Sequence, residues 1–166
     1  MKMKNIDNID YKILSILQKN ARTSNAEIAR QIGMAPSAVL ERIRKLEQRK
    51  VILGYEARVN AKLLGHGLTA FTFVRNEDKV GGTETETMLA AFPEVVEVHY
   101  TAGQDSYLVK VRVADTEGLS KLLKTFGQIP TARDTRSTIV LSTVKETLGP
   151  TVVQPLNGEE SNHDEN

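Results

Sequence analysis

The chain has 166 residues, of which 40% are hydrophobic and 11 are glycine, and its formal net charge is +1. This composition is typical of a folded chain with room for one large or two small domains, and it excludes a wholly disordered protein. No stretch approaches the roughly 18–20 uninterrupted apolar residues of a membrane-spanning helix, so no membrane partner is expected. The first residues lack the apolar segment of a secretory signal, and cysteine is absent, which removes disulfides and thiolate metal sites. A reducing cytoplasm is the predicted location.

The small net charge hides an uneven distribution along the chain. Residues 1–60 hold 12 Lys and Arg against 6 Asp and Glu, whereas residues 61–166 hold 10 against 15. A basic N-terminal part joined to an acidic remainder favours a nucleic-acid-binding domain attached to a second domain. Taken alone, the same charge distribution is also expected of two domains whose charged residues only face solvent and bind nothing.

The first sixty residues predict three helices. Apolar residues at helical spacing run from Asp10 towards Asn20. Ser24 and Glu27 have the S-x-x-E spacing of a capping box, which predicts the start of a short second helix. Gly33 is placed to end that helix in the left-handed conformation that a helix stop commonly requires.

A third helix is predicted to begin at Pro36, because the missing N–H of proline needs no partner in a first helical turn. Val39, Ile43 and Leu46 lie at i, i+4 and i+7 and form its predicted buried stripe. The opposite face and its margin supply the candidate DNA contacts, namely Ser37, Ala38, Glu41, Arg42, Arg44, Lys45 and Arg49. Two short helices joined by a tight glycine-containing turn form a helix-turn-helix, whose second helix fits the major groove. The alternative is an ordinary helical bundle with a basic surface.

The remainder of the chain predicts a small sandwich of strands and helices. Alternating residues predict strands over about 69–75, 95–101, 107–113 and 136–145, and helical spacing predicts helices over 83–92 and 116–126. The order β-α-β-β-α-β is that of the ferredoxin-like fold, with a four-stranded antiparallel sheet under two helices. The uncovered sheet face is expected to carry Phe71, Phe73, Ile139 or Leu141 and to be buried by a partner subunit.

The predicted fold class is therefore α+β, in three parts. Residues 1–60 form a helix-turn-helix domain with an extended connector strand, and residues 66–146 form the ferredoxin-like domain. Residues 149–166 are predicted to be a disordered tail, because they lack periodicity and hold two prolines and four acidic residues without Lys or Arg.

Several motifs, taken in order, resemble the leucine-responsive and asparagine-synthesis regulator (Lrp/AsnC) family of bacteria and archaea. Residues 6–14 are similar to the opening of the family, 28–47 to its helix-turn-helix, and 51–55 with 64–65 to its connector. Residues 101–108, with the sequence TAGQDSYL, are similar to the glycine-x-x-aspartate turn of its effector domain. The resemblance implies a winged-type helix-turn-helix in a transcription regulator that binds double-stranded DNA sequence-specifically and assembles as a homodimer or octamer, without catalytic activity.

The resemblance also implies a small-molecule effector, commonly an amino acid, bound in clefts between subunits. The residues carried over by position are Gly103, Gln104 and Asp105, with Thr135, Ser137 and Thr138 of the last strand opposite. A turn with free N–H groups can receive a carboxylate, and an aspartate can pair with an ammonium. The alternative is that residues 103–105 are merely a turn between strands, where Gly and Asp are common for backbone reasons.

Two residues depart from the usual pattern of the family. Ala35 stands where a serine or threonine usually caps the recognition helix, and the loss of such a cap costs about 0.5–2 kcal/mol. Lys50 stands where glycine is usual, so the turn after the third helix is expected to differ.

An enzyme reading remains as the alternative, because siroheme decarboxylases resemble this family in both halves. They typically carry an arginine-rich segment after the third helix and porphyrin-handling histidines in the second domain. Here residues 51–55 read VILGY, and His99 is the only histidine in the folded part of the sheet domain. His66, His99 and His163 have no partner at metal-ligand spacing, and nucleotide-binding and hydrolase motifs are absent. No metal and no cofactor are therefore expected.

Overall fold

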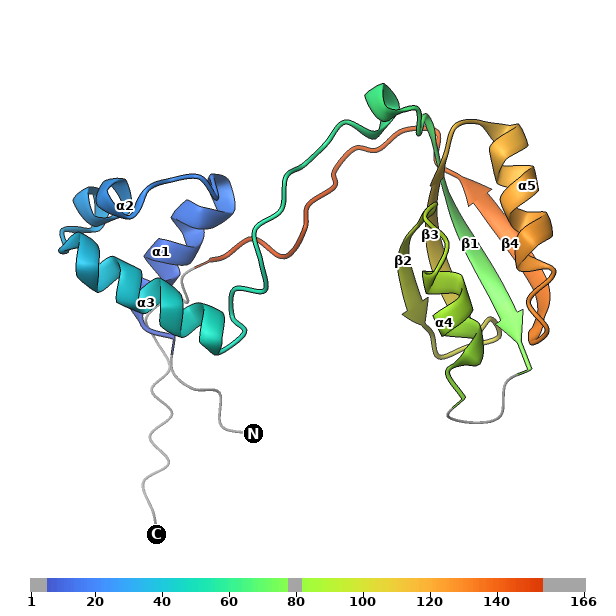
Figure 1. Cartoon of the computed structure of the whole chain (residues 1–166), viewed down its shortest axis with the longest axis horizontal. Coiled ribbons are helices and arrows are strands. Elements are labelled where there is room, and N and C mark those ends of the chain that lie inside the picture. Colours follow the sequence, from blue (N-terminus) through green and yellow to red (C-terminus); the bar gives the residue numbers. More distant parts are fainter. Residues whose placement is uncertain (1–5, 78–81, 154–166) are drawn as a thin grey trace, which may run out of the picture. The chain divides into compact units, whose positions relative to one another are not determined.

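The computed structural model describes residues 6–77 and 82–153, which divide into two compact units (Figure 1). One unit contains the chain up to Ala57 together with the segment from Thr147 onward, and the other is Arg58–Glu146. No helix in the described ranges has the length and apolar character that crossing a bilayer requires.

The first unit is a bundle of three helices, as predicted. They are α1 (Asn8–Lys19), α2 (Asn25–Ile32) and α3 (Pro36–Gln48). Their buried side chains form one apolar core made of Ile13, Leu17, Ile28, Ala29, Val39, Ile43 and Leu46. The three predicted stripe residues of α3 are all in this core, so the prediction of its buried face is confirmed.

The predicted capping box at the start of α2 is only half formed. The Ser24 hydroxyl accepts a hydrogen bond from the Glu27 N–H at 3.2 Å. The Glu27 carboxylate, however, accepts from the side chains of Arg30 and Gln31 rather than turning back to the cap. At the other end, Gly33 has φ +73° and stops the helix in the predicted left-handed conformation.

The turn after α3 has the geometry that a glycine would normally supply. The Val51 N–H donates to the Leu46 carbonyl and the Lys50 N–H to the Glu47 carbonyl, both at 2.9 Å, which is the Schellman pattern. Lys50 itself has φ +59°. The expectation of a different turn is therefore wrong: the usual turn forms around lysine, at a conformational cost of about 1–2 kcal/mol for a side chain in this region.

Relief of this strain gives a first prediction. Lys50→Gly is expected to raise the free energy of unfolding of the helical unit by about 1 kcal/mol, because glycine adopts a positive φ without steric conflict. Urea unfolding, read by helical circular dichroism and by hydrogen exchange of the α1–α3 amides, measures the change. Lys50→Ala keeps the strain and serves as the control. A glycine variant no more stable than the alanine variant would contradict the account.

The second unit consists of a short 3-10 helix and a βαββαβ arrangement. Its elements are η1 (Ala61–Leu64), β1 (Leu68–Asn76), α4 (Glu84–Ala90), β2 (Val95–Tyr100), β3 (Tyr107–Val113), α5 (Thr116–Phe126) and β4 (Ala132–Ile139). The four strands form an antiparallel sheet in the order β2-β3-β1-β4, and both helices cover one face of it (Figure 1). The predicted ferredoxin-like fold is confirmed.

Strand alternation divides the sheet residues between a helix-covered face and an open face. Ala70, Val74, Val109 and Val111 lie under the helices in one core with Phe126. On the open face, Phe71 is opposite Lys110 and Phe73 is opposite Leu108. Two of the four side chains predicted for the open face, Phe71 and Phe73, therefore lie there.

The last strand lies earlier in the chain than predicted. It spans Ala132–Ile139 rather than about 136–145, because β4 is an edge strand whose sequence, ARDTRSTI, carries mostly polar side chains and so lacks apolar alternation. Two side chains predicted for the open face are consequently elsewhere. Ile139 pairs with Ala70 and points to the helix-covered side, while Leu141 follows the strand and is 97% exposed.

Part of the predicted tail contacts the helical unit. The Gln18 amide on α1 donates to the Pro150 carbonyl at 2.7 Å, and its oxygen accepts from the Val152 N–H at 2.8 Å. Residues 149–153 have no regular secondary structure, and the rest of the predicted tail, residues 154–166, lies outside the described residues. In the connector predicted as a strand, residues 53–60 are neither helix nor strand.

Candidate nucleic-acid interface and effector site

Helix α3 has a polar outer face, because its apolar side is buried in the core of the helical unit. The exposed side chains on that face are Ser37, Glu41, Arg44, Lys45 and Gln48. The three predicted contacts at its margin, Ala38, Arg42 and Arg49, are half-buried. The structure thus places six of the seven predicted DNA contacts on one side of α3 and the seventh, Arg49, at its C-cap, and the residues at the centre of this face are more exposed than those at its margin.

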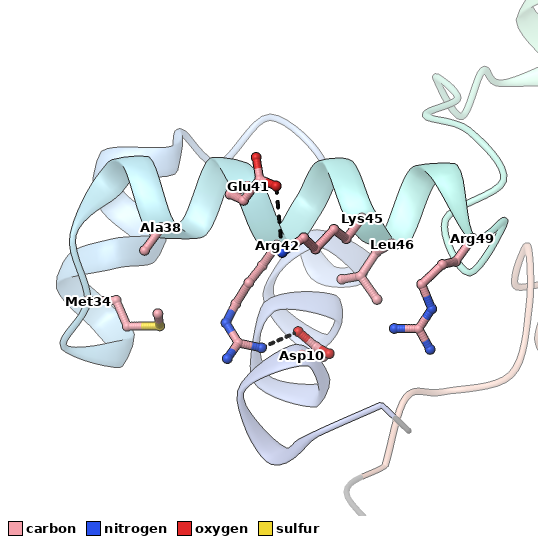
Figure 2. Close-up of a pocket in the computed structure, with 8 residues that line it drawn as sticks. All are labelled: Asp10, Met34, Ala38, Glu41, Arg42, Lys45, Leu46 and Arg49. Carbon is pink, nitrogen blue, oxygen red and sulfur yellow. Dashed lines mark hydrogen bonds and ion pairs between the residues drawn. The ribbon is translucent and has the colours of Figure 1, made fainter. Parts of the chain in front are cut away.

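A hollow of about 410 Å³ runs along the flank of α3 that faces α1 (Figure 2). Five of the seven predicted contacts line it, namely Ala38, Glu41, Arg42, Lys45 and Arg49. Within it, the Lys45 ammonium lies 3.6 Å from the Glu41 carboxylate, and both side chains are more than half exposed. Because such a surface pair contributes at most about 1 kcal/mol, a phosphate can compete for Lys45.

Arg42 joins α3 to the start of α1. Its Nη1 donates to the Asp7 carboxylate at 2.7 Å and to the Asp10 carboxylate at 2.8 Å, the latter contact drawn in Figure 2. The Arg42 side chain is 29% exposed and that of Asp10 only 9%. The hydrogen bonds to Asp7 and then to Asp10 raise the pKa of Arg42 above its usual value. This guanidinium, predicted as a DNA contact, is therefore engaged inside the unit.

Asp7 also caps α1. Its Oδ1 accepts from the N–H groups of Ile9 and Asp10 at 2.9 and 2.8 Å, and the Asp10 carboxylate accepts in return from the Asp7 N–H. Burial alone would raise the pKa of Asp7, but the hydrogen bonds from the Asp10 amide and from Arg42 outweigh it and lower that pKa. Sequence reasoning missed this capping box, although its signal, two aspartates three residues apart before an apolar run, was present.

The two aspartates give a second prediction. Arg42→Gln is expected to lower the free energy of unfolding of the helical unit by about 2 kcal/mol, because it leaves the buried Asp10 carboxylate without its cation. Thermal unfolding measures the change. Arg44→Gln, on the exposed stripe of the same helix, is the control and is expected to unfold like the wild type. Equal stability of both variants would show that Arg42 does not hold the helices together.

The ion pair between Asp7 and Arg42 also makes the stability of the helical unit depend on pH in the acid range. Because folding lowers the pKa of Asp7 below 3.8, its contribution to stability is complete above that value and is lost as the pH falls through the folded pKa. The wild type is therefore expected to lose stability on acidification more steeply than Arg42→Gln, and a titration of the Asp7 carboxyl by NMR should show its pKa rising in the variant.

The candidate effector site in the second unit is the loop between β2 and β3. The Thr101 N–H donates to the Ser106 carbonyl at 2.8 Å, and the Thr101 hydroxyl donates to the Asp105 carbonyl at 2.6 Å. These bonds tie the two ends of the loop together and hold Asp105, while Gly103 and Gln104 are exposed at its tip. The loop therefore fixes the backbone of Asp105 beside an exposed tip.

Asp105 is paired with an arginine that sequence reasoning missed. Arg136 of β4 donates from Nη2 to Asp105 Oδ2 at 2.7 Å, and its guanidinium lies 4.8 Å from the centre of the Phe73 ring. The Asp105 side chain is 24% exposed and the Arg136 side chain 69%. Since β4 alternates, the position of Arg136 beside Ser137 could have placed it on the open face, had the strand been predicted correctly.

The three polar residues predicted for the last strand are divided between its two faces. Thr135 is opposite Val74 and Ser137 opposite Thr72, so both point to the helix-covered side. The hydroxyls of Ser137 and Thr72 are 2.8 Å apart. Thr138 points to the open face. Within this unit, the structure brings Asp105 to Arg136 rather than to Thr135 or Ser137.

His99, on β2, has its Nε2 3.2 Å from Oε2 of Glu97. In the part of the chain that the structure describes, no three His, Asp or Glu side chains come close enough together to hold a metal ion.

A helix-turn-helix unit with a polar, basic outer helix face, joined to a ferredoxin-like unit, defines a class of DNA-binding transcription regulators. Residues 6–47 match the AsnC-type helix-turn-helix domain, and residues 69–150 match the Lrp/AsnC ligand binding domain. The chain belongs to the Lrp/AsnC family of transcriptional regulators.

Curated relatives match over most of their length. The chain is 38% identical to a leucine-responsive regulatory protein of Haemophilus influenzae over 148 residues, which are 87% of this chain and 89% of the relative. It is 39% identical to the HTH-type transcriptional regulator FL11 of Pyrococcus horikoshii over 143 residues, 86% of this chain and 93% of the relative.

Solved structures agree with the fold. The feast or famine regulatory protein of M. tuberculosis, in complex with L-methionine, superposes with a TM-score of 0.82 at 34% identity, covering 89% of this chain and 99% of that one. A transcriptional regulator of Neisseria meningitidis, also in complex with L-methionine, gives a TM-score of 0.81 at 28% identity, covering 87% and 95%.

Proposed function

We propose that α3 is the recognition helix and reads double-stranded DNA from the major groove. Ser37, Ala38 and Glu41, in its first turns, would approach base edges, where a carboxylate can accept from cytosine. Arg44, Lys45 and Arg49 would hold phosphates and bases. The observation that carries the proposal is the exposed polar stripe directly opposite the buried stripe of α3. Arg42 contributes by orienting the helix, through its ion pairs with α1.

We further propose that the chain acts as a homodimer that can assemble to an octamer. Large apolar side chains that are more than three-fifths exposed occur in the chain segments that connect the helical bundle to the sheet, at Leu53, Val59, Leu63, Leu64, Leu141, Val144 and Leu148. Apolar surface of this kind favours cover by another subunit. Two-fold symmetry then predicts a pseudo-palindromic operator with half-sites about one helical turn, or a multiple of it, apart.

Salt dependence gives a third prediction. Each phosphate that the protein neutralises adds about 0.9 to the slope of log affinity against log salt. Lys45→Ala is therefore expected to weaken binding to all duplexes and to flatten that slope by about 0.9 for each DNA-bound subunit. Fluorescence anisotropy on a site selected from a random library measures both. Lys121→Ala is the control, because Lys121 is an exposed lysine of α5 that also pairs with a glutamate on its own helix. Unchanged affinity with an unchanged slope in Lys45→Ala would show that Lys45 does not contact a DNA phosphate.

The effector site is proposed at the β2–β3 loop. An amino acid would bind there between subunits, with Gly103, Gln104 and Asp105 on one side and the part of β4 that contains Thr135, Ser137 and Thr138 on the other, where Thr138 has its side chain on the open face. The support is the partly exposed Asp105 carboxylate, whose charge suits an ammonium, together with the two similar regulators solved with L-methionine. Such an effector regulates only if its affinity differs between assembly or DNA-bound states.

Asp105 gives a fourth prediction. Asp105→Ala is expected to abolish amino-acid-dependent changes in assembly and DNA affinity while leaving DNA binding by the unliganded protein intact. Molar mass and DNA affinity, each with and without a thermal-shift hit among the twenty amino acids, test it. Asp134→Ala, an exposed acid on β4, is the control. A normal response in Asp105→Ala would move the site elsewhere.

We also infer that the chain is not an enzyme and works in the cytoplasm. The support is the pair of curated relatives above, both of which are transcriptional regulators. A Soret band that develops when the protein is incubated with haem or siroheme would overturn this inference and favour the decarboxylase alternative.

A further inference from the structure

We propose that Arg136 is the carboxylate-binding half of the effector site, and that the Asp105–Arg136 ion pair opens to admit the ligand. The incoming α-amino acid would place its ammonium on Asp105 and its carboxylate on Arg136. The inference rests on the effector site proposed above and extends it, because it assigns the second charge and limits the ligand to a free zwitterion.

The geometry of the pair suits such an exchange. The contact joins one guanidinium nitrogen to one carboxylate oxygen at 2.7 Å, so it is a single charged hydrogen bond. An α-amino acid carries an ammonium and a carboxylate on one carbon atom, close enough together to enter between two groups that are already in contact. One ion pair is thereby replaced by two, and the planar guanidinium can bind the ligand carboxylate through two parallel N–H groups.

Opening the pair costs little. The Arg136 side chain is 69% exposed and that of Asp105 is 24% exposed, so water reaches the arginine side of the pair and weakens the contact. Asp105 and Arg136 also neutralise each other when no ligand is bound, so neither charge is left without a partner. The ligand has to replace a single charged hydrogen bond, whose arginine partner is already largely exposed.

Each partner has a separate support that remains after the pair opens. The guanidinium of Arg136 lies over the ring of Phe73, its neighbour across β1 and β4, and a cation over an aromatic face is attracted to it. The backbone of Asp105 is held by the hydrogen bond that its carbonyl accepts from the Thr101 hydroxyl. The guanidinium of Arg136 and the backbone of Asp105 therefore each keep a contact when the ion pair opens.

The consequence is a specificity for both charged groups of the ligand. An amino alcohol, which lacks the carboxylate, and an N-acetyl amino acid, which lacks the ammonium, should each forgo one of the two new ion pairs. The side chain of the amino acid is not read by Asp105 or Arg136, so this requirement is independent of which amino acid the regulator senses.

Calorimetry on the full chain tests the assignment with L-methionine, L-methioninol and N-acetyl-L-methionine. A thermal-shift screen of the twenty amino acids comes first. If an amino acid other than methionine raises the melting temperature most, that amino acid, its amino alcohol and its N-acetyl derivative replace the methionine compounds. The wild type is expected to bind the amino acid at least about tenfold more tightly than either derivative. Arg136→Gln is expected to weaken binding of the amino acid to the level of the amino alcohol, with Arg136→Lys in between.

Arg133→Gln is the matched control, because Arg133 is also an exposed, ion-paired arginine of β4 but contacts Glu77. It should bind the amino acid like the wild type, and Arg136→Gln should melt at the same temperature as this control. A wild type that binds none of the twenty amino acids overturns the proposed effector site and the role of Arg136 with it. A wild type that binds an amino acid and its amino alcohol equally, or an Arg136→Gln variant that binds like the wild type, overturns the role of Arg136 alone.

Discussion

The buried stripe of α3 is the constraint on which the DNA-binding unit depends. Val39, Ile43 and Leu46 enter the same core as Ile13 and Ile28 and leave no freedom for the helix to rotate. Because an α-helix turns every 3.6 residues, the burial of one side fixes which residues face solvent on the other. The polar stripe is therefore a consequence of packing, and the arginine bridge from α3 to the start of α1 secures the same orientation with charge.

The same logic of alternation governs the sheet unit. Helices cover one face, so β1, β3 and β4 turn every second side chain towards the open face. That face carries Phe73 and Arg136 together, and the loop before β3 brings Asp105 to them. Phe73, Asp105 and Arg136, which span more than sixty residues of the sequence, are thereby brought together at one edge of the sheet.

Periodicity allowed the three helices, the βαββαβ order and the outward stripe of α3 to be predicted, because burial repeats with the period of each element. Contacts between distant residues left no such signal. Arg42 meets Asp7 and Asp10 across more than thirty residues, and a projection of α3 could place it only at the margin of the polar face. The edge strand β4 was predicted too late in the chain for a related reason, since its polar side chains hide the alternation, and the role of Arg136 was missed. Lys50 was recognised as unusual, but only its positive φ shows that the turn forms nonetheless.

The central claim, that the solvent-facing side of α3 is where duplex DNA binds, is tested most directly by NMR. Amide and arginine side-chain signals of the isotope-labelled full chain would be followed while a duplex is added at low salt. The account predicts that the largest shifts fall within α3 and at the arginine side chain of residue 44. Large shifts confined to the sheet unit, with the α3 signals unmoved, would contradict it.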